Sequence, residues 1–240
     1  MMPAGIVRVI RPVVVACMLY VFLFLSGTAL AATTTFSYAG PPVAIPDAPG
    51  AVCFSPWGVQ AEAPIVVSGI AGTVAKVTMS IDGTECSTGA GSATVGIDHT
   101  YVSDLQIKLR APDGTEVLVI DFIDGDGNNF CQVVLDDEAA TSIQTAVSAQ
   151  APFTGTWQPN APLSTFAGKN ANGTWSLLAQ DACPGDAGNI RAWSITITDN
   201  PAPVPAPSVS VPTLSEWGMI IFLVCAGLGS VLYLRRQRSV

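Results

Sequence analysis

Residues 104–120 have the pattern of a β-hairpin, two antiparallel strands joined by a tight turn. Apolar and polar residues alternate over residues 104–110, which is the period of a strand with one buried and one solvated face. Residues 112–114, Pro-Asp-Gly, then reverse the chain, because proline fixes its φ angle and glycine tolerates a positive one. The apolar run 117–120 returns as a strand buried on both sides. This unit predicts an antiparallel sheet.

Short strands separated by turn signals continue through residues 32–200. Residues 75–81 and 193–198 alternate like the hairpin, and only residues 141–148 resemble a helical turn. A span near 170 residues suits a single buried core. We therefore predict an all-β domain, an antiparallel sandwich of about eight or more strands over residues 65–200, preceded by an irregular extension with edge strands over residues 32–64.

The two ends of the chain have the composition of export and membrane segments. Residues 1–31 read as a signal peptide: basic residues precede an apolar run over residues 13–25, which is too short for a bilayer crossing, and Ala-Leu-Ala follows. Residues 217–234 are uncharged and long enough to span a membrane, and the basic flank after them places the C-terminus in the cytoplasm. Residues 201–211 are a Pro-rich spacer that reaches roughly 30 Å.

Charge narrows the classes of partner. Residues 32–200 hold 17 acidic and 5 basic residues, a net charge of −12, against −8 for the whole chain. Such a surface repels nucleic acid and anionic lipid and favours cations.

Four cysteines fall in the exported domain. They are Cys53, Cys86, Cys131 and Cys183, while Cys17 and Cys225 lie in the terminal segments. An even number in an exported domain predicts two disulfides, with three pairings open. The alternative, a zinc site, has no Cys-x-x-Cys pair and a single histidine to support it.

Nine short motifs within residues 65–198 carry a family resemblance. They are His99-Thr100-Tyr101, Asp104-Leu105, Ala111-Pro112-Asp113-Gly114-Thr115, Asn129-Phe130, Asp136-Asp137-Glu138-Ala139, Pro152-Phe153-Thr154-Gly155, Leu163-Ser164-Thr165-Phe166, Asn172-Gly173-Thr174-Trp175, and Gly185-Asp186 through Trp193-Ser194-Ile195. In this order they resemble the P domain (homo B domain) of proprotein convertases. The resemblance implies a jelly-roll β-sandwich, which in convertases packs beside a subtilisin-like protease domain and stabilises it. P domains also occur apart from any protease in bacterial surface proteins.

The chain departs from this family pattern in two places. Residues 82–96 are extra, so the resemblance implies that Cys86 pairs with the other nonstandard cysteine, Cys53. We favour the remaining pairing, Cys131 with Cys183, because it would tie together the two acidic loops that follow these cysteines. The 33 residues between Ala32 and Pro64 are too few for a protease domain. We therefore expect no serine-protease activity in this chain.

The tail resembles a second type of sequence, the Pro-Thr-Leu/Trp-Gly C-terminal sorting signal of Gram-negative bacteria. The sorting signal covers residues 212–240. The residues that carry the resemblance are Val211, Pro212, Thr213, Leu214, Trp217, Gly218, Arg235 and Arg236. Val211, just before the signal, stands where isoleucine is usual. Membrane-embedded enzymes of the exosortase type read such signals. The resemblance implies a membrane-anchored precursor whose tail is removed, which leaves the protein at the outer surface; an ordinary single-pass anchor is the alternative.

A catalytic site is not expected. Nucleophilic hydrolysis needs a base beside the nucleophile and an acid that orients the base. His99 is the sole candidate base, but Asp98, adjacent along a strand, points to the opposite face, and no Gly-x-Ser-x-Gly elbow exists. We expect His99 to be structural.

Calcium fits the acidic loops better than catalysis does. Ca²⁺ takes six to eight oxygen ligands. Two acidic loops supply carboxylates, and Asp104 at the start of an earlier strand adds another. The candidate ligands are Asp104, Asp136, Asp137, Asp181 and Asp186. Residues 124–135 begin like an EF-hand but have Asn129 and Leu135 at its sixth and twelfth positions, which excludes that motif. Solvated acidic loops are the alternative.

Three functions remain open. The first is a non-catalytic, exported P-domain protein that binds or stabilises another protein. The second is an accessory or remnant of a subtilisin-like protease system, with the catalytic chain supplied in trans. The third is a carbohydrate- or matrix-binding adhesin, for which Trp57 and Trp157 are the candidate platform.

Overall fold

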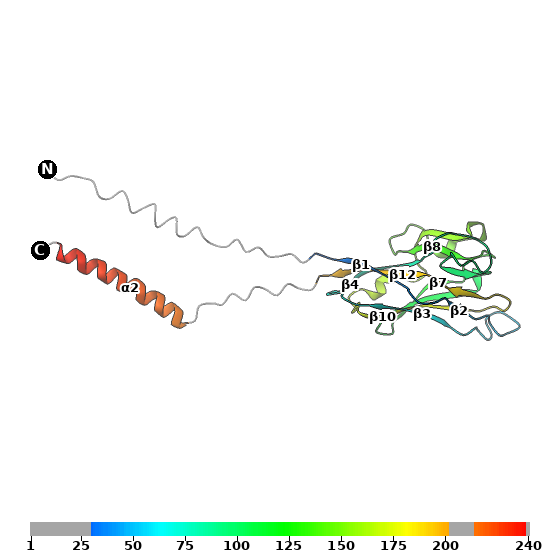
Figure 1. The fold of residues 1–240 in the computed structure, drawn as a ribbon, viewed down its shortest axis with the longest axis horizontal. Helices are drawn as coiled ribbons and strands as arrows, with labels where there is room; N and C mark the ends of the chain where they lie inside the picture. Colours follow the sequence, from blue (N-terminus) through cyan, green and yellow to red (C-terminus); the bar gives the residue numbers. More distant parts are fainter. Residues whose placement is uncertain (1–29, 202–213, 239–240) are drawn as a thin grey trace, which may run out of the picture. The chain divides into compact units, whose positions relative to one another are not determined.

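The computed structural model describes residues 30–201 and 214–238, which form two compact units. The first unit is a β-sandwich, with twelve strands and four short 3₁₀ helices among its described residues, and the second is the α-helix α2 (Figure 1). The predicted all-β sandwich with one C-terminal apolar helix is therefore confirmed for the described residues.

The larger sheet of the sandwich has eight strands. Seven follow the order β1-β12-β4-β8-β5-β11-β2, and β9 pairs with β8 from outside that path. Their bounds are β1 (Thr33–Ser37), β12 (Trp193–Asn200), β4 (Thr73–Ile81), β8 (Phe130–Leu135), β5 (Ile97–His99), β11 (Gly188–Ile190), β2 (Val43–Ile45) and β9 (Phe153–Trp157). The pairs are antiparallel except for β8 and β9, which are parallel.

The parallel pair explains the predicted helical turn. Parallel neighbours need a crossover connection, because a tight turn cannot join them. Two 3₁₀ helices, η2 (Ile143–Thr145) and η3 (Ser148–Gln150), form part of that connection between β8 and β9. The turn expected over residues 141–148 is therefore present as two short pieces.

The smaller sheet has the order β3-β10-β6-β7. Its strands are β3 (Ala61–Val67), β10 (Gly173–Asp181), β6 (Leu105–Arg110) and β7 (Glu116–Asp121). The predicted hairpin is the pair β6–β7, closed by a hydrogen bond from the N–H of Gly114 to the carbonyl of Ala111 (2.9 Å). Gly114 has φ +84°, a conformation that glycine adopts without strain.

Both sheets contribute side chains to one core. Its largest fully buried members include Trp175, Trp193, Phe130, Phe153 and Phe166. The indole N–H of Trp175 donates to the carbonyl of Ala171 (2.8 Å), and its ring packs edge-on against Phe166 at 5.0 Å. The hydrophobic effect of burying these rings is what holds the two layers together.

The N-terminal extension is more ordered than the sequence suggested. It contributes β1 and β2 to the larger sheet, and β3 begins at Ala61, four residues before the expected boundary at residue 65. Alanines at residues 61 and 63 supply the buried face of β3, and alanine is a weak strand signal. Pro64 is tolerated because β3 is an edge strand.

Both disulfides form, but the favoured pairing was wrong. The bonds are Cys53–Cys183 and Cys86–Cys131. The loop of residues 82–96 lies against the start of β8, where the side-chain amide of Asn129 donates to the carbonyls of Ser87 and Gly89. This places Cys86 beside Cys131 and leaves Cys53 for Cys183.

The second unit is α2 (Leu214–Gln237). Trp217–Gln237 contains an 18-residue window with a mean hydropathy of 2.1, so this segment is long and apolar enough to cross a membrane by length and composition. Arg235 and Arg236 lie in its last turn. The predicted signal peptide up to residue 29, the spacer beyond Pro201, and the motif residues Val211, Pro212 and Thr213 lie outside the described residues.

Candidate functional site

Strands of the smaller sheet bring acidic residues to one edge of the sandwich. Leu105, at the start of β6, pairs with Asp181, at the end of β10. The residues just outside this pair remain joined, because the N–H of Ala182 donates to the carbonyl of Asp104 (2.9 Å). On the other side, the N–H of Phe122 donates to the carbonyl of Leu105 (3.2 Å), so the end of β7 lies at the same edge.

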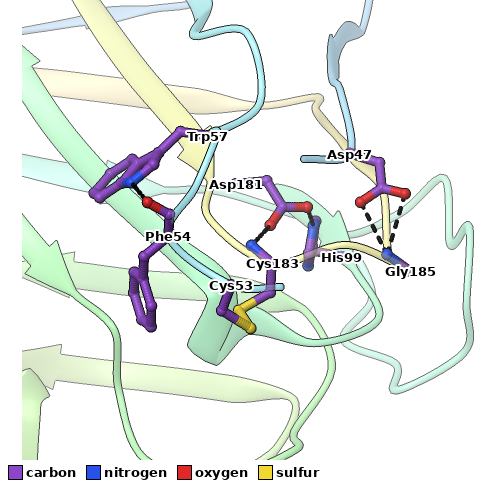
Figure 2. The surroundings of a disulfide bond; sticks show 8 residues. All are labelled: Asp47, Cys53, Phe54, Trp57, His99, Asp181, Cys183 and Gly185. Atoms are coloured by element: carbon purple, nitrogen blue, oxygen red, sulfur yellow. Dashed lines mark hydrogen bonds and ion pairs between the residues drawn. A yellow bond between two sulfur atoms is a disulfide. The ribbon is translucent and has the colours of Figure 1, made fainter. Parts of the chain in front are cut away.

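The segment before β3 folds over this edge and is covalently attached to it. The Cys53–Cys183 disulfide fixes it to the loop that follows β10. The N–H of Gly58 donates to the carbonyl of Asp181 at 2.8 Å. Gly58 has no room for a side chain, since a Cβ would collide with the carbonyl oxygen of Pro46. Figure 2 shows the Cys53–Cys183 disulfide with Phe54, Trp57 and Asp181 around it.

His99 is a structural residue of the site. Its side chain is 0 % exposed, and its Nε2 lies 3.3 Å from Oδ2 of Asp181. Its Nδ1 lies 3.0 Å from the carbonyl oxygen of Tyr101, so each ring nitrogen has a partner. The other oxygen of Asp181 accepts the N–H of Cys183 (2.9 Å), as Figure 2 shows. The imidazole therefore orients the loop that carries Cys183 and has no surface for a substrate.

Asp98 faces away from His99, as the strand pattern predicted. It is 3 % exposed, and its carboxylate binds Arg191 in a two-pronged pair, with Nε–Oδ1 at 2.9 Å and Nη2–Oδ2 at 3.0 Å. The amide of Asn189 lies 3.3 Å from Oδ2. Asp98 is thus committed to a buried ion pair and does not orient the imidazole.

Asp104 lies at the centre of a cluster of four carboxylates. It is 7 % exposed, and burial, followed by the negative charge of Asp181, raises its pKa to about 6. His99 lowers this pKa, while Asp186 and Asp47 raise it further. We call Asp47, Asp104, Asp181 and Asp186 the acidic cluster.

The other members of the acidic cluster have hydrogen-bond donors. Asp47 accepts the N–H of Gly185 at 2.9 and 3.1 Å, and Asp186 accepts the hydroxyl of Thr100. Among the described residues, no donor reaches the carboxylate of Asp104. Its charge is therefore the least compensated of the four.

Replacing Asp104 with Asn is expected to stabilise the chelator-treated protein at neutral pH. A carboxyl whose pKa rises from 3.8 to about 6 on folding stabilises the fold fully below pH 3.8 and loses that contribution as the pH rises through 6. At pH 7 its charge costs roughly 1–3 kcal/mol, which the amide removes. Urea denaturation at pH 7 should show this gain, and at pH 3.5 the gain should vanish. An equal gain at both pH values would contradict the assignment.

Two of the five predicted calcium ligands lie elsewhere. Asp136 pairs with Lys76 (Nζ–Oδ1 3.0 Å). Burial raises the pKa of Asp136, but hydrogen bonds from the N–H of Glu138 and from Lys76 outweigh it and hold that pKa below its usual range. The carboxylate of Asp137 accepts both N–H groups at the start of η4 (Leu163–Phe166), each at 2.7 Å.

The strand β8 separates these two acids from the acidic cluster. Its first residue, Phe130, pairs with Ile97 in the strand that carries His99, and its last residue is followed by Asp136. Six residues at about 3.3 Å each amount to roughly 20 Å. The structure therefore brings together Asp104, Asp181 and Asp186 but not Asp136 or Asp137. Among the described residues, no three His, Cys, Asp or Glu side chains are arranged as a metal site.

Three aromatic side chains beside the acidic cluster were missed as a group in the sequence. The rings of Phe54, Trp57 and Phe122 contact one another edge-on, with centroids 5.2–6.3 Å apart. We call them the ring cluster. In the sequence, two of them follow Cys53 closely and the third follows the hairpin. Only the disulfide topology brings these two segments together.

The two predicted platform tryptophans have different surroundings. Trp57 belongs to the ring cluster and donates its indole N–H to the carbonyl of Phe54 (3.1 Å). Trp157 is partly buried against the core and donates its indole N–H to the carbonyl of Thr154 (2.7 Å).

Comparisons with known proteins support the P domain. Residues 90–197 match the family model described as proprotein convertase P-domain. Leupeptin-inactivating enzyme 1 of Streptomyces exfoliatus is 30% identical over 154 residues, which cover 64% of this chain and 24% of that protein, so the chain spans about a quarter of this relative.

Two solved structures are also similar. They are the serine protease of Aeromonas sobria and the same protease in complex with its chaperone, both at 17% identity. Their TM-scores are 0.39 and 0.37, and the alignments cover 72% and 71% of this chain and 28% and 27% of those chains.

Proposed function

We propose that this chain is a non-catalytic accessory module of the P-domain type that binds another protein and stabilises it. The observation that carries the proposal is the match of residues 90–197 to the P-domain family model. The buried state of His99 supports it, because an activated nucleophile needs a base that a substrate can approach. The module therefore contributes binding rather than chemistry.

The test is recovery of a stoichiometric partner. The tagged full chain is purified from its host in mild detergent, and the retained protein is identified and melted with and without this chain. Because a ligand that binds only the folded state stabilises it, the midpoint of the partner should rise in proportion to occupancy. A partner whose midpoint does not change, or the absence of any stoichiometric partner, would contradict the proposal.

The favoured class of partner is a subtilisin-like serine protease supplied in trans. The resemblance of the module to convertase P domains supports this choice. So does leupeptin-inactivating enzyme 1, a relative named as an enzyme, in which the aligned region makes up 24% of the protein. The complex should then cleave casein, and a serine-directed inhibitor should label the partner and not this chain. Labelling of this chain would contradict the assignment of roles.

Calcium is proposed as a stabiliser of the acidic cluster. The fit rests on Asp104, whose carboxylate accepts no hydrogen bond from a described residue and whose pKa is raised by the negative charges of Asp181, Asp186 and Asp47. Asp104, Asp181 and Asp186 would hold the cation, with Asp47 in place of the distant Asp136 and Asp137. We expect Ca²⁺ to raise the melting midpoint of the full chain at pH 7 and EDTA to lower it. Asp104→Asn should abolish this response and Glu138→Gln should keep it; a midpoint indifferent to calcium would contradict the site.

Export and surface sorting are proposed from the two terminal segments. The apolar helix α2 with Arg235 and Arg236 in its last turn supports a membrane-anchored precursor with a cytoplasmic C-terminus. Deleting residues 217–240 should release the protein unprocessed into the medium. Changing Pro212 and Thr213 to Ala keeps the helix and separates the two alternatives: it should block processing by a sorting enzyme and leave an ordinary anchor unaffected.

A further inference from the structure

We infer that the ring cluster docks an arginine side chain of the partner protein. The inference rests on the proposed function of the module as a protein-binding domain and names the surface and the chemistry of that binding. Four observations carry it: the position of the rings outside the core with Phe54 exposed, the backbone conformation of Phe54 and Phe122, the charges around the rings, and the carboxylate of Asp104, which has no described hydrogen-bond donor.

The rings are not part of the core. Phe54 is 55 % exposed, and none of the three ring residues belongs to the buried core or to the side chains packed against it. They contact one another instead, on a segment that the Cys53–Cys183 disulfide attaches to the sandwich. Exposed aromatic rings held in a fixed arrangement are typical of binding surfaces.

Two of the three rings stand on strained backbone. Phe54 has φ +67° and Phe122 has φ +49°, a region that disfavours bulky L-residues. Four non-glycine residues have positive φ among those that the structure describes, and two of them are in this cluster. The fold thus maintains an unfavourable conformation in order to present these rings together, and such strain concentrates at functional sites.

Charge complementarity selects the occupant. Each of the five Lys and Arg residues of the sandwich already pairs with an acid away from the rings: Lys76 with Asp136 and Glu138, Lys108 with Glu116, Arg110 with Glu62, Lys169 with Asp113, and Arg191 with Asp98. None of these five residues forms an ion pair with Asp104, Asp124 or Asp126. Asp124 and Asp126 are exposed in the loop that follows Phe122. The ring cluster is therefore bordered by acids that no Lys or Arg of the sandwich neutralises.

Backbone hydrogen bonds connect the main chain of Asp104 to the segments that carry the rings. The N–H of Phe54 donates to the carbonyl of Ala182 (2.5 Å), and the N–H of Ala182 donates to the carbonyl of Asp104. From the other side, Phe122 bonds to Leu105, the neighbour of Asp104. Asp104 is 7 % exposed as a residue, and its carboxylate accepts no hydrogen bond from the residues that the structure describes.

Arginine satisfies all of these groups at once. Its planar guanidinium stacks on aromatic faces, and tryptophan is the best of them. The same group donates two parallel hydrogen bonds to a carboxylate, which lysine cannot do. A peptide arginine that crosses Trp57 toward Asp104 would therefore use both the ring face and the charge.

The probe is a short Gly/Ala peptide that carries arginine, compared with the same peptide in which citrulline, a neutral isostere, replaces arginine. Binding to the full chain in detergent micelles with EDTA present is measured by fluorescence anisotropy. We expect citrulline to weaken binding roughly five- to thirty-fold, the range of a cation on an aromatic face. Equal affinity for the two peptides, or no binding of either, would overturn the inference.

Variants separate docking from packing. Phe54→Gly and Phe122→Gly relieve the positive φ, so they should keep or raise the melting midpoint while binding is lost. Val66→Ala, an exposed apolar change on β3, and Glu138→Gln, a distant charge change, should leave binding intact. If the glycine variants melt early, Trp57→Leu decides: lost binding supports docking and retained binding overturns it.

The partner assay distinguishes this inference from the proposed function. If the wild-type chain retains a stabilised partner and the ring variants retain it equally well, the function stands and the ring cluster is not its docking surface. If the wild-type chain retains no partner, the proposed function itself fails.

Discussion

Replacing Cys53 and Cys183 with alanine should lower the free energy of unfolding of the sandwich by about 5 kcal/mol. The bond joins residues 130 apart, and the chain-entropy model assigns about that value to a loop of this length. For a domain of this size the melting midpoint should fall by roughly 10–20 °C. Calorimetry without reductant measures the effect, and a fall below roughly 2 °C would contradict it.

The second disulfide provides the matched control. Cys86 and Cys131 are 45 residues apart, so their replacement should cost about 4 kcal/mol, slightly less than the first pair. Digestion without reductant followed by mass spectrometry should recover one peptide pair containing Cys53 with Cys183 and another containing Cys86 with Cys131. A peptide that links Cys53 to Cys86 would restore the pairing that the sequence favoured.

Replacing Arg191 with methionine should destabilise the sandwich by about 3–5 kcal/mol, because it leaves the buried carboxylate of Asp98 without its cation. Changing Asp98 to Asn in the same chain should recover much of the loss, since no buried charge then remains. Arg110→Met is the control: its pair with Glu62 is half-exposed, and such pairs contribute about 0–1 kcal/mol. Equal losses for the two arginines, measured by urea denaturation, would contradict the distinction.

The strands of the sandwich could be predicted because their signal is local. Alternation of apolar and polar residues over residues 104–110 and the Pro-Asp-Gly turn after it depend on neighbours in sequence, and both are present as β6 and the β6–β7 turn. The weak points were local too. β3 begins with two alanines and a proline, which are weak predictors of a strand.

The disulfide pairing could not be predicted, because four cysteines allow three connectivities that local pattern does not rank. The decision depends on where the loop of residues 82–96 lies. It returns to β8 through hydrogen bonds of Asn129, a contact between segments about 40 residues apart.

The candidate site was predicted in part for the same reason. Asp104, Asp181 and Asp186 each adjoin a strand end, and so do Asp136 and Asp137, but sequence does not say which ends share an edge of the sandwich. The pairing of β6 with β10 brings Asp104 and Asp181 to one edge, and Asp186 lies in the loop that follows β10. The length of β8 separates Asp136 and Asp137 from that edge. The rings of the ring cluster come together only through the strand pairing at the end of β7 and the Cys53–Cys183 disulfide. No local sequence pattern therefore indicates this cluster.

The neighbouring positions of β1 and β12 affect how the chain can be made. Thr33 pairs with Thr198, and the N–H of Asp199 donates to the carbonyl of Ala32 (2.9 Å). Strand β12 also pairs with β4, so the last strand to be synthesised lies between two of the earliest. The edges of β1 and β4 therefore stay unpaired until residue 200 has left the ribosome and any translocation channel. Contacts this distant in sequence make folding slow, so the nascent chain is vulnerable to aggregation and proteolysis until β12 has paired with β1 and β4.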